Sequence, residues 1–286
     1  MNIILLVLGF ILLLKGADWF VDGASSIASR FGIPQLIIGL TIVAMGTSLP
    51  EAFVSITAAL KSNAAITIGN VVGSNILNVG IILGITALIR PLHIQNSTMK
   101  YEMPFMILVT FVLILLGINT TISRLDGIIM WLFFLGYLYY IFKMSKNQME
   151  ETEIKQTNPL FIPLGLICLM MGSNFAVDAA TNIAISFGVS QRFIGLTIVA
   201  LGTSLPELVT SVTAAKKGNA DIAIGNIIGS NIFNILFVVG SSALITPVPF
   251  EPHFIIDSFV AILIGLVLYL CTKKQEYSTK KPVYSC

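Results

Sequence analysis

Charged residues are scarce in this chain. Asp, Glu, Lys and Arg make up 10% of its 286 residues, against about 25% in a typical soluble domain. So few charges cannot cover a surface that faces water, which excludes an ordinary soluble protein. Histidine occurs only twice, and the three cysteines have no framework spacing, which argues against a zinc site or a disulfide scaffold. The net charge of +2 is spread over loops, so nothing indicates a nucleic-acid-binding surface.

Long apolar runs take the place of charge. Hydrophobic residues make up 56% of the chain, and the mean hydropathy is +0.92. Several runs reach the length needed to cross a hydrocarbon layer about 30 Å thick. The sequence therefore predicts an all-α polytopic membrane protein with about nine transmembrane helices. The predicted segments are 3–27, 33–60, 64–89, 101–118, 125–143, 159–184, 190–216, 220–245 and 253–271.

Basic residues fall mainly on one side when alternate loops are assigned to opposite faces of the membrane. Twelve lie on the first side and three on the second. Because cytoplasmic loops are enriched in Lys and Arg, we expect the N-terminus outside and the C-terminus in the cytoplasm of a cell (plasma or inner) membrane. The second side holds Lys61, Arg124 and Arg192. The first holds Arg30, Arg90, Lys100, Lys143, Lys146, Lys155, Lys216, Lys217, Lys273, Lys274, Lys280 and Lys281.

An internal repeat with an offset of 156 residues organises the chain. Residues 39–60 (GLTIVAMGTSLPEAFVSITAAL) and 195–216 (GLTIVALGTSLPELVTSVTAAK) are identical at 16 of 22 positions, and 64–80 matches 220–236 at the same offset. Five spans separate equivalent points, so the second copy is expected to cross the membrane in the opposite sense, as in many transporters. The predicted domains are a first repeat (1–143), a cytoplasmic linker (144–158) and an inverted second repeat with a short cytoplasmic tail (159–286).

The motif GTSLPE occurs in the middle of a predicted span in both copies. Pro50 has no amide hydrogen to donate, so the helix is expected to break just before Glu51, and the same holds for Pro206 and Glu207. Broken helices at membrane depth are tolerated where they line a cavity. A carboxylate there costs about 2.5–3.5 kcal/mol on insertion scales, so a functional role is the default interpretation.

Oxygen-bearing side chains surround these glutamates at helical spacing. Glu51 shares a helix face with Thr47 and Ser55, and the next segment presents Asn70, Ser74 and Asn78; the second copy has the same residues 156 positions later. Oxygen ligands without Cys or His suit hard cations such as Ca²⁺ or Na⁺. Hydroxyl and amide groups also join membrane helices, and for Ser55 and Ser211 alone that structural role is the preferred interpretation.

In these motifs, G-T-S-x-P-E and G-N-x-x-G-S-N-x-x-N in both halves, the sequence resembles the cation/calcium exchanger superfamily, specifically its prokaryotic sodium/calcium exchangers. The resemblance implies two inverted five-helix bundles around midplane cation sites. It assigns calcium to the carboxylates of Glu51 and Glu207 and the carbonyls of Thr47 and Thr203. The implied sodium ligands are these glutamates together with Ala44, Ala200, Ser48, Ser74, Ser204 and Ser230, and Asn78 and Asn234 complete the central site.

The chain departs from that family pattern in two ways. Asn234 stands where relatives often have Asp, which in potassium-dependent members is tied to potassium use, so we expect K⁺-independent transport. The fifth helix of the first repeat (about 125–143) maps by offset to 281–299, beyond Cys286. An expected tenth span is therefore missing.

The leading hypothesis is a secondary antiporter that exchanges Na⁺ for Ca²⁺ by alternating access. A Ca²⁺/H⁺ antiporter is the alternative, because buried glutamates can also take up protons, and a cation channel is a further one. An enzyme is not expected, since no activated nucleophile or cofactor motif is present. The expected partners are the lipid bilayer and the two transported ions, with no nucleic acid and no obligatory protein partner.

Overall fold

A computed structural model describes residues 2–92, 94–147, 158, 160–189, 198 and 200–279. Seven of its helices are long and apolar enough to cross a membrane. An eighth span results if the bent pair Gln35–Thr47 and Leu49–Leu60 is counted as one. The predicted segment 190–216 lies partly outside the described residues, so nine spans stays a prediction. Most of the predicted linker, 144–158, and the tail from residue 280 also lie outside them.

The first half of the chain forms a series of long and interrupted helices. Its elements are α1 (Asn2–Phe31), α2 (Gln35–Ile38), the π-helix η1 (Gly39–Val43), α3 (Ala44–Thr47), α4 (Leu49–Leu60), α5 (Ile66–Leu77), η2 (Asn78–Ile82), α6 (Leu83–Ile89), η3 (Thr98–Glu102), α7 (Met103–Gly117), the short strand β1 (Thr121–Ile122) and α8 (Arg124–Asn147).

From Ala200 to Ile245 the second half has the same order of helices as residues 44–89, but its strand comes before the last helix, whereas β1 follows α7. Its elements are α9 (Phe161–Ser186), α11 (Ala200–Thr203), α12 (Leu205–Lys216), α13 (Ala220–Phe233), η5 (Asn234–Val239), α14 (Gly240–Ile245), β2 (Val248–Pro249) and α15 (Pro252–Thr279). The equivalent helices of the two halves therefore begin at similar distances from their GTSLPE motifs.

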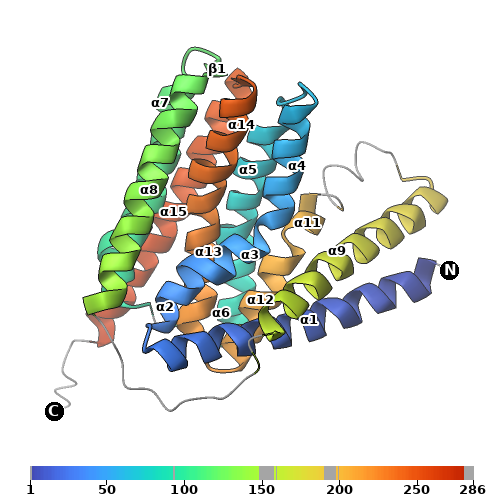
Figure 1. Cartoon of the computed structure of the whole chain (residues 1–286), viewed down its shortest axis with the longest axis vertical. Helices are drawn as coiled ribbons and strands as arrows, with labels where there is room; N and C mark the ends of the chain where they lie inside the picture. Colours follow the sequence, from blue (N-terminus) through green and yellow to red (C-terminus); the bar gives the residue numbers. More distant parts are fainter. Residues whose placement is uncertain are drawn as a thin grey trace.

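Helices α1 and α9 pack lengthwise against each other and run obliquely to the other helices (Figure 1). Glycines bring their backbones together. A Cβ atom built at Gly16 would lie 2.8 Å from the carbonyl oxygen of Gly165, and one at Gly172 would lie 2.7 Å from that of Gly9. Because the early residue of one helix meets the late residue of the other, α1 and α9 are antiparallel. Small residues at this spacing are typical of close helix contacts in membranes.

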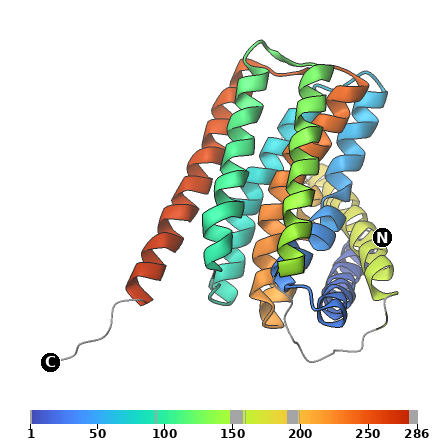
Figure 2. The ribbon, with the colours of Figure 1, turned by 60° about the vertical axis from the view of Figure 1, so that its left-hand side comes forward.

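The remaining long helices form an upright bundle with α13 at its centre (Figures 1 and 2). Helix α13 contacts α12, η1, α2, α3 and α7, and α8 and α15 lie at the outside of the bundle. At one end β1 pairs with β2 in antiparallel register, Ile122 opposite Val248. These strands join the loop before α8 to the loop before α15, which holds the outer helices in place.

Two arginines lie beside loops at the two ends of the molecule. Arg90 donates to the carbonyl oxygens of Ala215 and Lys216, both at 3.4 Å. Arg124 lies at the opposite end, where it donates to the carbonyl oxygen of Ile245 at 3.2 Å. Arg90 follows α6 and Arg124 follows β1, and these two elements lie toward opposite ends of the molecule (Figure 1).

Helix breaks occur where the sequence predicts them. The axis bends by 48° between Gln35–Thr47 and Leu49–Leu60, at Ser48, and Pro50 stands in the first turn of the following helix. Proline is favoured there because its missing amide hydrogen is not needed. The sequence did not reveal the π-helical turns. Two of them begin at Asn78 and Asn234, and such turns are frequent at functional sites.

Candidate cation site

The two repeat glutamates lie in the first turns of α4 and α12, inside the protein. Glu51 and Glu207 are both 0% exposed. Each follows directly on the break at Ser48 or Ser204, so the interrupted helix fixes the depth of its carboxylate. Ser48, three residues before Glu51, donates to Glu207 at 2.9 Å, so the structure brings the two glutamates into one region although 156 residues separate them.

Serine hydroxyls hold one oxygen of each carboxylate. Ser48 donates to Oε1 of Glu207 at 2.9 Å, and Ser74 donates to Oε1 of Glu51 at 3.3 Å. The first of these bonds joins the two halves of the chain. The second carboxylate oxygens, Glu51 Oε2 and Glu207 Oε2, are buried and have no hydrogen-bond partner among the described residues.

Four asparagines form a second polar layer across the same interface. Asn75 Nδ2 donates to the carbonyl oxygen of Asn231 at 3.1 Å, and Asn231 Nδ2 donates to that of Asn75 at 3.2 Å. Asn78 donates to Asn231 Oδ1 at 3.0 Å, and Asn234 donates to Asn75 Oδ1 at 3.2 Å. These bonds use the amide nitrogens, so Oδ1 of Asn78 and Oδ1 of Asn234 are left buried without a described partner.

The reciprocal pair Asn75 and Asn231 was not among the predicted site residues. Both lie within the GSN part of the repeated motif, at the common offset of 156. That offset was the available signal, because an identical polar residue in both copies of a buried helix requires a partner. Their role in this structure is to fix the orientation of Asn78 and Asn234.

Four oxygens of the site therefore have no hydrogen-bond partner among the described residues, in two equivalent pairs, Glu51 with Glu207 and Asn78 with Asn234. Buried acceptors without donors are rare, because desolvation without a hydrogen bond costs about 1–3 kcal/mol. A hard cation satisfies such oxygens. Within the described ranges there is no group of three or more His, Cys, Asp or Glu side chains, so two carboxylates supply the formal charge.

Neighbouring side chains hold the site helices together. Asn70 Nδ2 donates to Ser55 Oγ at 2.9 Å and to the carbonyl oxygen of Glu51 at 3.2 Å. The second half repeats this arrangement: Asn226 Nδ2 donates to Ser211 Oγ at 2.9 Å. The hydroxyls of Ser55 and Ser211 are thus used between helices, which agrees with the structural role preferred for them.

The other predicted ligands lie around the same point. Thr47 donates to Asn226 Oδ1 at 3.0 Å, and Ser204 donates to Ser74 Oγ at 3.4 Å. The carbonyl oxygen of Ala44 accepts from Ser230 Oγ at 3.3 Å. In the second half Ala200 begins α11, and Thr203 ends that helix. The predicted set is thus gathered in one region, and its role as a ligand set stays a prediction.

Acidic residues of α1 lie apart from this region. Asp18 and Asp22 pair with Lys217 at 3.2 and 2.9 Å. All three side chains are partly exposed, so these ion pairs join α1 to the end of α12.

Comparisons with known proteins agree with this arrangement. The sequence model of the family described as "Sodium/calcium exchanger protein" matches residues 1–143 and 157–280. Inner membrane protein YrbG of Escherichia coli is 39% identical over 93% of this chain and 87% of its own length. Sodium/calcium exchanger MaX1 of Methanosarcina acetivorans is 32% identical over 94% of this chain and 90% of its own length.

A solved structure has the same fold. The sodium-calcium exchanger NCX_Mj, soaked with 2.5 mM Na⁺ and 10 mM Sr²⁺, superposes with a TM-score of 0.83 over 95% of this chain and 90% of its own, at 36% identity. At 95% of this chain, the match extends over both halves. The family, the relatives and the fold lead to one conclusion: this chain is a multi-pass membrane protein that belongs to the sodium/calcium exchanger family of cation antiporters.

Proposed function

We propose that this protein exchanges Na⁺ for Ca²⁺ through a single central site that opens alternately to the two sides of the membrane. The observation that carries the proposal is a set of four oxygens, from Glu51, Glu207, Asn78 and Asn234, that lack a partner in the part of the chain that the structure describes. They are buried, they belong to both halves of the chain, and oxygen is the ligand atom that Ca²⁺ and Na⁺ prefer.

The proposed ligands follow the positions of the repeated motif. Calcium would be bound by the carboxylates of Glu51 and Glu207 and by the carbonyls of Thr47 and Thr203. Sodium would use the same glutamates, with carbonyl oxygens and hydroxyls of the residues around them. These further sodium ligands are Ala44, Ala200, Ser48, Ser204, Ser74 and Ser230, with Asn78 and Asn234 in the centre.

Charge explains why the two ions compete. Two carboxylates are neutralised by one Ca²⁺ or by two Na⁺, and three Na⁺ leave one positive charge in excess. Binding of one ion therefore removes the electrostatic reason to bind the other. A ratio of three to one would move net charge across the membrane, and the transport current measures it.

The repeat supplies the two access states. We propose that residues 1–143 and 159–286 are inverted copies, joined by a cytoplasmic linker, with the N-terminus outside. The antiparallel contact of α1 with α9 supports this. Gly165 and Gly172 are the repeat equivalents of Gly9 and Gly16. Because Gly9 contacts Gly172 and Gly16 contacts Gly165, each glycine contacts the equivalent of the other, as a two-fold relation between the copies requires. In this mechanism α1 and α9 move as one unit against the bundle, and differential ion binding in the two states couples the fluxes.

Calcium uptake into proteoliposomes tests the function. Vesicles loaded with Na⁺ are diluted into Na⁺-free medium containing Ca²⁺, with and without a proton ionophore. We expect uptake that requires internal Na⁺ and continues when the ionophore removes the pH gradient. Uptake driven by a pH gradient in the absence of Na⁺ would replace this proposal by Ca²⁺/H⁺ antiport, and uncoupled, non-saturating flux would replace it by a channel.

Orientation has a separate test. A reporter that is active only in the cytoplasm is fused after Cys286, and a second one is inserted after Asn119, at the β1–β2 end. We expect activity from the first and none from the second. The reverse pattern would invert the proposed orientation without affecting the ion site.

A further inference from the structure

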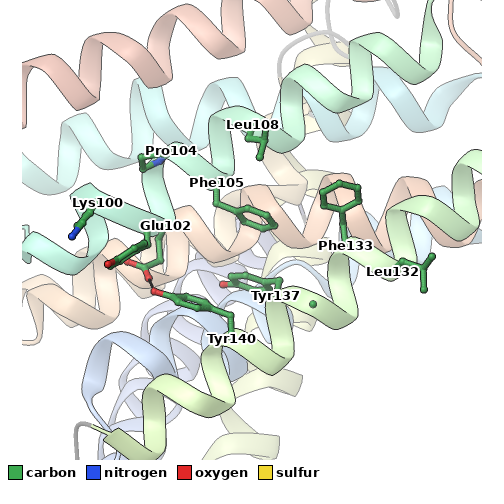
Figure 3. Close-up of a pocket in the computed structure, with 11 residues that line it drawn as sticks. Lys100, Glu102, Pro104, Phe105, Leu108, Leu132, Phe133, Tyr137 and Tyr140 are labelled. Carbon is green, nitrogen blue, oxygen red and sulfur yellow. Dashed lines mark hydrogen bonds between the residues drawn. The ribbon is translucent and has the colours of Figure 1, made fainter.

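A groove of about 620 Å³ lies between α7 with its preceding turn η3 and α8, away from the cation site. Figure 3 shows its walls, where Phe105 and Leu108 face Leu132 and Phe133 from the opposite helix. Both helices are long and apolar enough to cross a membrane. In an apolar stretch of 18 residues in α8, only 28% of the residues are buried within the protein. The groove is therefore on the part of the surface that faces the hydrocarbon of the bilayer.

The end of the groove nearest the basic loops is polar. Glu102 lines it and is 1% exposed. The Tyr140 hydroxyl donates to Glu102 Oε1, as Figure 3 shows, and Oε2 has no hydrogen-bond partner in the part of the chain that the structure describes. An ionisable group at such a position requires a partner. The second half has no equivalent, because Ser258 stands 156 positions after Glu102.

A basic group stands at the rim beside this carboxylate. Lys100 lines the groove and is exposed, and its Nζ lies 5.3 Å from the ring centroid of Tyr101. The described residues offer it no ion pair at 4 Å or less. From Lys100 to Leu108 the helix rises by about 12 Å, so the charged end of the groove is followed by a long apolar part.

We propose that this groove binds phosphatidylethanolamine, with the ammonium on Glu102 Oε2, the phosphate near Lys100 and an acyl chain between α7 and α8. Charge complementarity selects this lipid. Its head group carries one positive and one negative charge, as the groove does with the signs reversed. A primary ammonium has N–H donors for the unpaired oxygen, whereas a quaternary ammonium has none. A purely anionic head group would place a negative charge against Glu102.

The groove is connected to the broken helix of the cation site. The ring of Tyr137 stacks on Phe105, with centroids 5.7 Å apart, and the Tyr137 hydroxyl donates to the carbonyl oxygen of Leu40 at 3.2 Å. Leu40 belongs to η1, which leads directly into the Ala44–Thr47 segment. A lipid that fills the groove would therefore pack against Tyr137, whose hydrogen bond to Leu40 holds η1 and the segment after it in place.

Native mass spectrometry of the purified full chain tests the site. The protein is titrated separately with phosphatidylethanolamine, phosphatidylcholine and phosphatidylglycerol that have the same acyl chains. We expect a preference of about tenfold or more for phosphatidylethanolamine over phosphatidylcholine, which is the difference that one charge-assisted hydrogen bond makes. Phosphatidylglycerol is expected to bind more weakly than phosphatidylethanolamine.

Two substitutions locate the binding. Glu102→Gln keeps the shape and the bond to Tyr140 but removes the charge, so the preference should fall to about equal binding of the two zwitterionic lipids. Gly136→Leu fills the middle of the groove, where a Cβ atom meets no described atom within 4 Å, and should weaken binding of every lipid. Gly84→Leu on α6 is the matched control, because Gly84 is equally open and lies outside the groove.

Equal binding of phosphatidylethanolamine and phosphatidylcholine by the parent protein would overturn the proposal. An unchanged preference in Glu102→Gln, or the same effect from Gly84→Leu as from Gly136→Leu, would also overturn it. A single-chain primary amine that displaces phosphatidylethanolamine completely at equal concentration would assign the groove to free amphiphilic amines instead. Because binding is measured without transport, the result is independent of which ions the protein exchanges.

Discussion

Helices α5 and α13 carry the same motif, and the structure places them in different surroundings. In an apolar stretch of 18 residues taken from each span, 94% of the residues are buried in the span that begins with α13, against 44% in the span that begins with α5. The motif residues of α13 are nearly all enclosed, and Asn226 is buried where Asn70 is partly exposed. The same sequence pattern therefore forms the centre of the bundle in one half and part of its periphery in the other.

Glycines show how this difference arises. A Cβ atom at Gly229 would lie 2.6 Å from the carbonyl oxygen of Leu40, and one at Gly225 would lie 2.7 Å from that of Leu36. The equivalent Gly73 has no described atom within 4 Å of such a Cβ. Small residues in both copies permit close approach, and in the described structure only α13 uses it.

Hydrogen bonds differ between the halves as well. Ser74 donates to the Glu51 carboxylate, whereas the equivalent Ser230 donates to the carbonyl oxygen of Ala44. Ser48 donates to Glu207, whereas Ser204 donates to Ser74. Equivalent side chains thus reach the same site but donate to different acceptors, so the hydrogen bonds of the site are not symmetric between the two halves.

The largest expected effect concerns the glutamates, which test whether both halves are needed. Glu51→Gln and Glu207→Gln each remove a charged ligand without changing shape, so we expect Na⁺-dependent Ca²⁺ uptake to fall by about 10- to 100-fold or more in both. Glu251→Gln, which changes an exposed residue paired with His253, is the control and should transport normally. Near-normal uptake by one of the two variants would confine the calcium site to the other half.

Gly229→Ala and Gly73→Ala test the packing difference directly. The first substitution forces α13 away from η1, and overpacking of this kind costs about 1–3 kcal/mol. The second places a methyl group where no described atom lies within 4 Å, and it gains up to about 1 kcal/mol of helix propensity. We expect a lower midpoint of thermal unfolding for Gly229→Ala and an equal or higher one for Gly73→Ala. Equal destabilisation of the two would mean that α5 is packed as closely as α13.

Asn234→Asp and Asn78→Asp place a third carboxyl group in the site. Each variant loses an amide donor, to Asn75 at 3.2 Å or to Asn231 at 3.0 Å, and adds a like charge near Glu51 and Glu207. The added group must therefore bind a proton or recruit another cation, and we expect transport that depends on pH or on K⁺. Initial Ca²⁺ uptake with K⁺ replaced by choline measures this. The parent should be indifferent to the replacement, and loss of its activity in choline would contradict the proposed K⁺ independence.

The smallest expected effect comes from Ser55→Ala and Ser211→Ala. Each removes one bond of 2.9 Å to an asparagine that still has the carbonyl of a glutamate as acceptor. Hydrogen bonds between membrane helices average about 0.6 kcal/mol, so we expect small and similar losses of thermal stability with transport retained. A strong loss of transport without a loss of stability would show that one of these hydroxyls binds an ion.

Much of the site could be predicted from the sequence because the repeat marks it twice. Glu51 and Glu207 stand out as acids in apolar spans, each directly after a proline, and the structure buries both beside a helix break. The pair Asn75 and Asn231 was missed, since their bonds to each other's backbone depend on how two distant helices meet. The groove at Glu102 was missed for the same reason, because Tyr140 lies on a different helix.

By itself the sequence determined that this chain belongs in a membrane, where its helices break and which residues carry charge at the break. These are local properties: hydropathy fixes the spans, and proline fixes the interruption. Only the tertiary structure decided that α13 rather than α5 is central and which oxygen each serine contacts. It also decided that Oε2 of Glu51 and of Glu207 has no donor among the described residues. The physical reason is that two nearly identical motifs have the same local energies, so their different surroundings come from packing against segments far away in the chain.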